Sequence, residues 1–186
     1  MLEAERYRFT VDEFDRMAEA GVLAEDSRVE LLAGEIIQMP PIGARHAACV
    51  GTLNLLFAPL AVRGAALVWV QNPVWLGEVD EPCPDVVLLR PRADRYRTKH
   101  PTAADILLLV EVSDSTLRYD LIRKVPLYAR AGVVEAWVVD LLHDRMLVHR
   151  NPGPDGYRTV TTLGRGDSVT AASFPDHSLA VSDILV

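Results

Sequence analysis

Short apolar blocks, bounded by turn-forming residues, follow one another along the 186-residue chain. Two of the blocks are almost wholly apolar, and each carries a single acid. They are Asp85 to Leu89 and Ile106 to Val112, the second of which contains Glu111. A carboxylate among hydrocarbon neighbours is costly unless it is paired, neutralised or bound to a metal. We therefore expect these two strands to organise both the fold and the site.

Three segments have the spacing or composition of helices: residues 9–21, 45–62 and 117–131. The first is amphipathic and begins with a capping box of Thr10 and Glu13. The second is rich in alanine and leucine, which predicts a long and mostly buried helix. Pro126 should break or restart the third helix, because proline lacks a backbone donor and clashes with the preceding turn.

The other blocks predict strands. A hairpin is expected around Ala33 and Gly34, between residues 28–32 and 35–39. Further strands are expected at residues 65–71, 74–77, 85–89, 106–112 and 134–141, with a meander at 146–150, 157–163 and Val169. Many strands with two or three helices indicate a mixed α/β (α+β) domain, in which helices pack one central sheet. The length suits a single domain, which we place at residues 4–186.

The composition is that of an ordinary globular protein, with 49% hydrophobic and 24% charged residues. No apolar run approaches the roughly 20 residues that span a bilayer, and Met1 to Arg6 has acids where a signal peptide is basic. We therefore expect a cytoplasmic protein with no membrane partner.

Cys49 and Cys83 are too few for a disulfide framework and are expected to be reduced. The net charge of −7 argues against coating of nucleic acid by bulk electrostatics.

Strand alternation places the two acids on defined faces. Asp85 shares a face with Val87, and Glu111 shares a face with Leu107. If the strands are neighbours, Asp85 and Glu111 converge at one end of the sheet. Two carboxylates around one hard cation suit Mg²⁺, which polarises a phosphoryl oxygen and lowers the pKa of bound water.

Lys124 and Glu30 are the further candidates for this site. Lys124 follows Glu111 by 13 positions and could bring an ammonium to the same edge, to orient water or offset transition-state charge. Glu30, in the first hairpin, is a third acid. Each has a simpler interpretation: Asp120 and Lys124 could form a surface pair, and Glu30 could pair with Arg28 or with an arginine elsewhere.

A basic loop and one histidine also have two interpretations. The loop at residues 90–100 could grip phosphates, with Tyr96 stacking on a base, or could simply be solvated. His46 could contact a phosphate or a metal-bound water, although a structural or surface role fits a single histidine better. Core or interface positions are expected for the three tryptophans: Trp69, Trp75 and Trp137.

Several motifs resemble those of one nuclease family. Pro84-Asp85, followed 26 positions later by Glu111, is similar to the signature of the PD-(D/E)XK nucleases. Nearly the whole chain resembles the Uma-two-type restriction endonucleases of that superfamily. The matching motifs are Tyr7-x-Phe9-Thr10-x-Asp12-Glu13-Phe14, Val29-Glu30-Leu31-Leu32-Ala33-Gly34-Glu35, Met39-Pro40-Pro41, Pro84-Asp85-Val86-Val87, Val110-Glu111-Val112-Ser113-x-x-Thr116 and Tyr119-Asp120-x-x-x-Lys124-x-Pro126-Leu127-Tyr128-Ala129-x-Ala131-Gly132-Val133-x-Glu135-x-Trp137-Val138-Val139-Asp140.

The resemblance implies a restriction-endonuclease-like fold and a set of catalytic residues. Asp85 and Glu111 would hold the metal, Mg²⁺ or Mn²⁺, with Glu30 assisting as a third metal ligand. The third motif position is Ser113 rather than lysine, and serine supplies no ammonium. The family moves that lysine to the next helix, which here implies Lys124 and makes Pro126 an ordinary kink of that helix.

Three functions remain open. The leading hypothesis is a Mg²⁺-dependent DNA endonuclease. A catalytically inactive oligomeric domain that binds nucleic acid or protein is the second, and a metal-dependent hydrolase of RNA or a nucleotide is the third. A homodimer or higher homo-oligomer is expected, because cutting two strands symmetrically needs two sites.

Overall fold

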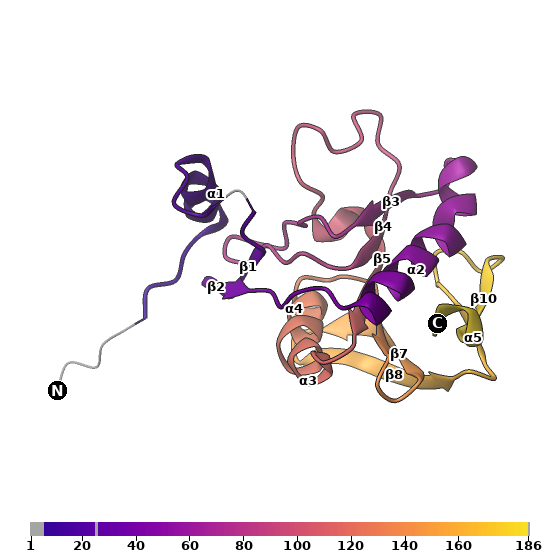
Figure 1. Cartoon of the computed structure of the whole chain (residues 1–186). Coiled ribbons are helices and arrows are strands. Elements are labelled where there is room, and N and C mark those ends of the chain that lie inside the picture. Colours follow the sequence, from indigo (N-terminus) through magenta and orange to yellow (C-terminus); the bar gives the residue numbers. More distant parts are fainter. Residues whose placement is uncertain (1–5, 25, 186) are drawn as a thin grey trace.

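A six-stranded sheet lies at the centre of the molecule (Figure 1), which the computed structural model describes over residues 6–24 and 26–185. The strand order is β3-β4-β5-β6-β7-β8. β5 and β6 run parallel, and every other neighbouring pair is antiparallel. The strands are β3 (Leu67–Val70), β4 (Val86–Leu89), β5 (Ile106–Ser113), β6 (Glu135–Asp140), β7 (Arg145–Gly153) and β8 (Gly156–Gly164). The expectation of one mixed sheet packed by helices is confirmed.

Side chains of β4 alternate between two hydrophobic cores on opposite faces of the sheet. Val86 and Leu88 pack in the core that contains α2 (Ala44–Val62), whereas Val87 and Leu89 pack in the core that contains α4 (Val125–Arg130). All four side chains are buried. Both faces of the strand are therefore covered, which explains its continuous apolar run and gives an acid at its end a largely dry environment.

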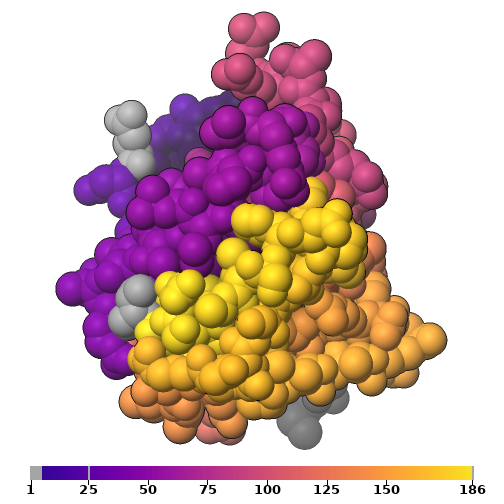
Figure 2. Space-filling model, turned by 90° about the vertical axis from the view of Figure 1, so that its right-hand side faces the viewer, coloured from indigo at the N-terminus to yellow at the C-terminus, as the bar shows by residue number. Residues whose placement is uncertain are grey.

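Helix α2 is buried along one face only, so the expectation of a mostly buried helix is wrong. Leu55 and Val62 are exposed on its outer side. Its buried residues are Cys49, Val50, Leu53, Phe57 and Leu60. Figure 2 shows α2 beside the C-terminal segment, which contains α5 (Val181–Ile184). By length and hydropathy α2 would also qualify as a membrane span, but this is weak evidence because core helices meet the same criteria.

The third predicted helix runs without interruption to Arg130 but changes its winding at Asp120. α3 (Leu117–Tyr119) leads into a π-helical turn, η2 (Asp120–Lys124), which α4 continues directly. Pro126 lies at the start of α4 and has no amide to bond to the preceding turn. In place of the break predicted at Pro126, the helix widens locally in the turn η2 that precedes this proline. The chain leaves the helix at Gly132, whose φ of +84° suits a glycine after a helix end.

Two of the strand predictions are wrong. Residues 74–77 form a loop, because Val74 and Leu76 donate hydrogen bonds to the nearby carbonyls of Pro82 and Asp80. The strand at Val169 does not extend the meander. It is β9 (Ser168–Thr170), which pairs with β10 (Ser178–Ala180) in a separate two-stranded sheet.

A bulge in β5 changes the face of Leu107. The register with β4 shifts between Leu88 and Leu89, so that β5 contains one extra residue at this point. Leu107 consequently packs in the α2 core, while Leu109 packs in the α4 core. The predicted shared face of Leu107 and Glu111 is therefore wrong, whereas the alternation from Leu109 to Glu111 is regular.

The N-terminal helix and hairpin agree with their predictions. In α1 (Val11–Glu19) the amide of Glu13 donates to Thr10 Oγ1 at 3.2 Å and the amide of Thr10 donates to Glu13 Oε2 at 2.9 Å. β1 (Val29–Leu32) and β2 (Glu35–Gln38) pair around Ala33 and Gly34, which both have positive φ. Residues 1–5, on which the argument against a signal peptide depends, and the domain ends at 4 and 186 lie outside the described residues.

Candidate functional site

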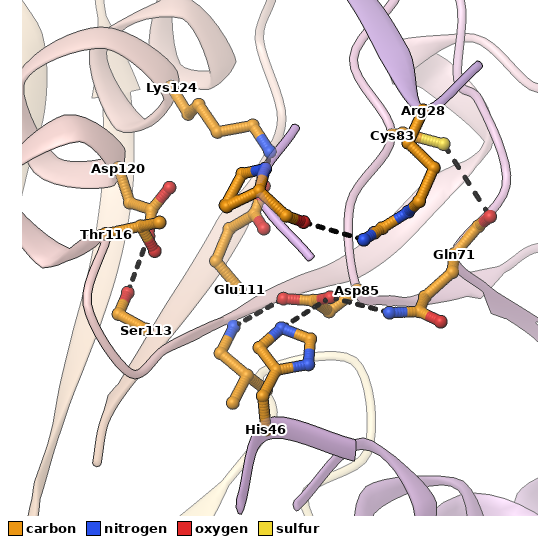
Figure 3. A network of polar contacts seen from close by, with 12 residues as sticks. Arg28, His46, Gln71, Cys83, Asp85, Glu111, Ser113, Thr116, Asp120 and Lys124 are labelled. Atoms are coloured by element: carbon orange, nitrogen blue, oxygen red, sulfur yellow. Dashed lines mark hydrogen bonds and ion pairs between the residues drawn. The ribbon is translucent and has the colours of Figure 1, made fainter. Parts of the chain in front are cut away.

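Four predicted site residues meet in one pocket of about 600 Å³. Figure 3 shows three of them: Asp85, Glu111 and Lys124. Glu30 comes from β1, Asp85 directly precedes β4, Glu111 lies near the end of β5, and Lys124 ends the π-helical turn η2. Val86 pairs with Val110 in the antiparallel β4–β5 ladder, which brings the positions of Asp85 and Glu111 next to each other. The structure therefore brings together groups that are up to 94 positions apart in the chain.

Lys124 bridges two of the acids. Its Nζ lies 2.9 Å from Glu111 Oε1 and 3.1 Å from Glu30 Oε2, and the ammonium is buried. Burial alone would lower the pKa of Lys124, but the negative charges of Glu111 and Glu30 outweigh it and raise this pKa. Lys124 therefore stays protonated and supplies a fixed positive charge to the pocket.

Asp120 does not form the surface pair with Lys124 that its spacing suggested. Both side chains are buried. Oδ2 of Asp120 accepts hydrogen bonds from the hydroxyls of Ser113 and Thr116, each at 2.7 Å. This contact links the start of the third helix to the end of β5, next to Glu111.

The carboxyl group of Glu111 has a strongly raised pKa. Burial raises its pKa to about 8, the Lys124 ammonium opposes that rise, and the negative charges of Asp85 and Asp120 add to it. Oε1 of Glu111 also accepts a hydrogen bond from the hydroxyl of Tyr128, a fully buried residue of α4. Two donors therefore converge on one carboxylate oxygen.

Asp85 is held by three donors from three separate segments. Its Oδ1 lies 3.0 Å from His46 Nε2 and accepts from Gln71 Nε2 at 3.2 Å, while its Oδ2 accepts from the amide of Val112 at 2.8 Å. Burial opposes the ionisation of Asp85, but His46 and the Val112 amide outweigh it and lower the pKa. The hydrogen bond to Asp85 raises the pKa of His46 against its own burial. His46 therefore reaches the candidate site, as an ion-pair partner of Asp85.

Glu30 is tied to Lys124 and to the backbone, not to Arg28. The amide of Cys83 donates to Glu30 Oε2 at 3.2 Å. Arg28 instead donates to the carbonyl of Pro40 at 2.7 Å, at the rim of the pocket. Cys83 and the buried Cys49 are both free thiols, as expected.

The donor set fits a hydrated divalent cation. Carboxylate oxygens are the ligands that Mg²⁺ prefers, and Glu30, Asp85, Glu111 and Asp120 bring four carboxyl groups to the pocket beside the one ammonium of Lys124. Within residues 6–24 and 26–185, no group of three His, Cys, Asp or Glu side chains is placed so that all three could bind one metal ion. Mg²⁺ keeps several waters and uses one or two carboxylates, so a complete cage is not needed.

The basic loop lies at the other end of β4 from Asp85 (Figure 1). Four strand residues separate the two ends by about 13 Å. Tyr96 is buried, its hydroxyl donates to the carbonyl of Arg90 at 2.8 Å, and Arg92 lies 4.2 Å from its ring centre. The proposal that Tyr96 stacks on a base is therefore wrong.

Each of the three tryptophans packs against a hydrophobic cluster, as expected: Trp69, Trp75 and Trp137.

Three contact residues of the site were not predicted: Gln71, Tyr128 and the buried Asp120. The spacing of Lys124 and Tyr128 carried a usable signal, because residues four apart share one face of a helix. Gln71 carried none, since its role depends on the pairing of β3 with β4.

Comparisons with known proteins agree with this geometry. A family model described as "Putative restriction endonuclease" (Uma2) matches residues 11–182. A crystal structure described as a "putative nuclease belonging to DUF820", from Anabaena variabilis, has a TM-score of 0.74 at 16% sequence identity. That match covers 95% of this chain and 97% of the other. None of the curated proteins matches this chain.

The mixed sheet and its flanking helices define a protein of the restriction-endonuclease-like fold. The chain belongs to the Uma2 restriction endonuclease family.

Proposed function

We propose that this protein is a metal-dependent endonuclease that hydrolyses phosphodiester bonds of DNA. The observation that carries the proposal is the contact of one buried ammonium, that of Lys124, with Glu111 and Glu30 in the pocket that Asp85 also lines. Family membership and fold support the nuclease class. The donor chemistry supports the metal requirement.

Each residue has a distinct role in this proposal. Asp85 and Glu111 would hold Mg²⁺ or Mn²⁺, and Glu30 assists by fixing the position of Lys124. A cation held there would polarise the phosphoryl oxygen and lower the pKa of a water molecule. Water adds its oxygen to phosphorus, the bond to the leaving oxygen breaks, and that oxygen leaves with a proton. Lys124 offsets the charge that develops on the phosphoryl oxygens, a role for which its permanent protonation suits it.

The test compares nuclease activity of the wild-type protein with that of Asp85→Asn, Glu111→Gln and Lys124→Met. Removing one such group costs about 100-fold to 1000-fold in rate where it stabilises the transition state. Wild-type activity should require Mg²⁺ or Mn²⁺ and vanish in EDTA. Equal activity in EDTA, or in all three variants, would contradict the proposal.

Glu135→Gln is the matched control. Glu135 is also a buried carboxylate of the central sheet, but it bonds to Trp137 and Arg150 and does not line the pocket. This variant should keep its activity per folded molecule. No metal affinity and no cleavage by the wild-type protein would instead favour a non-catalytic binding domain.

A further inference from the structure

Arg28 is the one arginine among the described residues that lines the pocket of the acids. It directly precedes β1, and its carbonyl accepts from the amide of Met39 at 2.8 Å, so it continues the hairpin ladder. Residues two apart in a strand share a face, and Arg28 therefore points to the same side as Glu30. Glu30 is 3% exposed, whereas Arg28 is only partly buried. Figure 3 shows Arg28 and Lys124 entering the pocket from different sides.

The guanidinium of Arg28 has no acid partner among residues 6–24 and 26–185. Its hydrogen bond goes to a neutral group, the carbonyl of Pro40, at 2.7 Å. Glu30, the nearest acid along the strand, is bonded to Lys124 and to the amide of Cys83 instead. The positive charge of Arg28 therefore stays available to an anion that enters the pocket.

Every other basic side chain of the pocket is already paired. Lys124 lies between two of the acids, and His46 Nε2 lies 3.0 Å from Asp85 Oδ1. Within the part of the chain that the structure describes, Arg28 is thus the pocket cation whose charge no carboxylate offsets.

The contact with Pro40 fixes the guanidinium before a ligand arrives. Proline fixes its own φ, and Pro41 restricts the ψ of Pro40, so the accepting carbonyl belongs to a stiff segment. An arginine that is held in this way loses less side-chain entropy when it binds. The N–H groups of a guanidinium form a planar fork, so a single bond to a carbonyl leaves an edge free for two oxygens of a phosphate.

We infer that Arg28 binds the phosphate group of the DNA strand that enters the pocket, through two of its oxygens at once. The charge of the guanidinium offsets the repulsion between that phosphate and the neighbouring carboxylates. This inference rests on the proposed nuclease function, and it adds the residue that recognises the phosphate.

Two substitutions separate this role from a purely structural one. A structural role would use Arg28 only to tie the start of β1 to the carbonyl of Pro40, for which a neutral donor would serve equally well. Arg28→Gln keeps an N–H donor and removes the charge, and Arg28→Lys keeps the charge and removes the planar fork. Because Arg28 is only partly buried, both variants should fold.

The experiment measures binding of a fluorescein-labelled DNA duplex by anisotropy in Ca²⁺ over a series of salt concentrations. The logarithm of the affinity falls with the logarithm of the salt concentration, with a slope of about −0.9 for each phosphate that the protein neutralises. Arg28→Gln should bind about tenfold to 100-fold more weakly, and its slope should be less steep by about 0.9. Unchanged slope and affinity in this variant would overturn the inference.

Arg28→Lys should keep the wild-type slope and bind about fivefold more weakly, because one ammonium replaces a two-point contact. Wild-type affinity in this variant would overturn the contact through two oxygens. The lysine variant also decides the matter alone if Arg28→Gln does not fold.

Arg165→Gln is the matched control. Arg165 pairs with Asp144 at 2.9 Å, and neither residue lines the pocket. This variant loses the same charge as Arg28→Gln and should keep the wild-type slope and affinity. Equal effects of the two glutamine variants would overturn the inference, because they would show that only the net charge of the protein matters.

Cleavage in Mn²⁺ distinguishes failure of the inference from failure of the proposed function. Arg28→Gln should raise KM more than it lowers kcat, because the contact forms with bound DNA as well as in the transition state. Wild-type binding and kinetics in Arg28→Gln would overturn the inference and leave the nuclease function intact. If the wild-type protein cuts no DNA, the proposed function fails, and the salt dependence of binding still decides whether Arg28 holds a phosphate.

Discussion

Tyr128 donates its hydroxyl to Oε1 of Glu111, the same oxygen that lies 2.9 Å from the Nζ of Lys124. Among the described residues, the hydrogen bonds and ion pairs of the Glu111 side chain all end on this oxygen. Oε2 is consequently the oxygen left for a cation in the pocket. Tyr128 lies too deep in α4 to touch a substrate. It is therefore a positioning residue, which fixes the rotation of the Glu111 carboxylate.

Tyr128→Phe should weaken metal binding far more than it weakens the fold. Loss of an outer partner of a metal-ligating carboxylate typically costs about tenfold to 100-fold in metal affinity. The lost hydrogen bond should lower the free energy of unfolding by only about 1–3 kcal/mol. Calorimetric titration with Mn²⁺ measures the first effect, and urea unfolding measures the second.

Tyr157→Phe is the control for that experiment. Tyr157 is another largely buried tyrosine, and its hydroxyl donates to the carbonyl of Val133 at 2.7 Å, outside the pocket. Its loss should leave Mn²⁺ affinity unchanged. A Tyr128→Phe variant that binds Mn²⁺ as tightly as the wild type would show that the tyrosine has a packing role only.

Lys124→Met should destabilise the protein in a way that divalent metal partly reverses. The change leaves Glu30 buried without its cation and takes from Glu111 one of its two donors, and breaking a buried pair in this way costs about 3–5 kcal/mol. Mg²⁺ bound at the acids would restore positive charge to the pocket. Urea unfolding at neutral pH, with and without Mg²⁺, measures both effects.

The chain contains one other lysine, which serves as the control. Lys99 lies 4.3 Å from the ring centre of Trp75, outside the pocket. Lys99→Met should cost no more than about 1 kcal/mol, the range of an exposed cation–π contact. Its stability should not gain from Mg²⁺ relative to the wild type. Loss of stability in Lys124→Met that Mg²⁺ leaves unchanged would count against a metal site at these acids.

The sequence predicted the meeting of Asp85 and Glu111 on the condition that their strands are neighbours, because strand alternation is a local property. It failed where the backbone departs from a regular period. The extra residue of the β5 bulge moves Leu107 to the other face, and the π-helical turn brings Asp120 into contact with Ser113. Neither departure changes the spacing of apolar residues. For this reason, a pattern that assumes regular strands and helices does not reveal them.

Contacts that depend on tertiary pairing were also out of reach of the sequence. Gln71 follows β3 with a φ of +50° and donates to Asp85 across 14 positions of chain. His46 reaches the same carboxylate from the first turns of α2. The placement of Lys124 came from the family motif, since its spacing alone allowed a surface pair equally well.

Gly34→Ala should destabilise the hairpin that carries Glu30. Gly34 has a φ of +75°, and a Cβ there would lie 2.5 Å from Arg8 Cβ and 3.1 Å from the carbonyl oxygen of Phe9. Backbone strain and a clash with fixed neighbours should together cost about 2–4 kcal/mol. Gly21→Ala is the control, because Gly21 has a similar φ of +70° with open space around its Cβ position. Equal losses of unfolding free energy in the two variants would contradict the predicted clash.

His149 should make the fold less stable as the pH falls below about 6.5. Burial lowers the pKa of this imidazole to about 4, and among the described residues its Nε2 has no hydrogen-bond partner. Because the folded state disfavours the charged form, the stabilising contribution is complete above the unfolded pKa of about 6.5 and disappears as the pH falls through about 4. With solvent screening allowed for, the free energy of unfolding should change by about 1–2 kcal/mol.

Urea unfolding of the wild type and of His149→Leu across pH 4 to 7 isolates the effect, since His149→Leu removes only this titration. Parallel stability curves of the two proteins would show that His149 ionises equally easily in the folded and unfolded states.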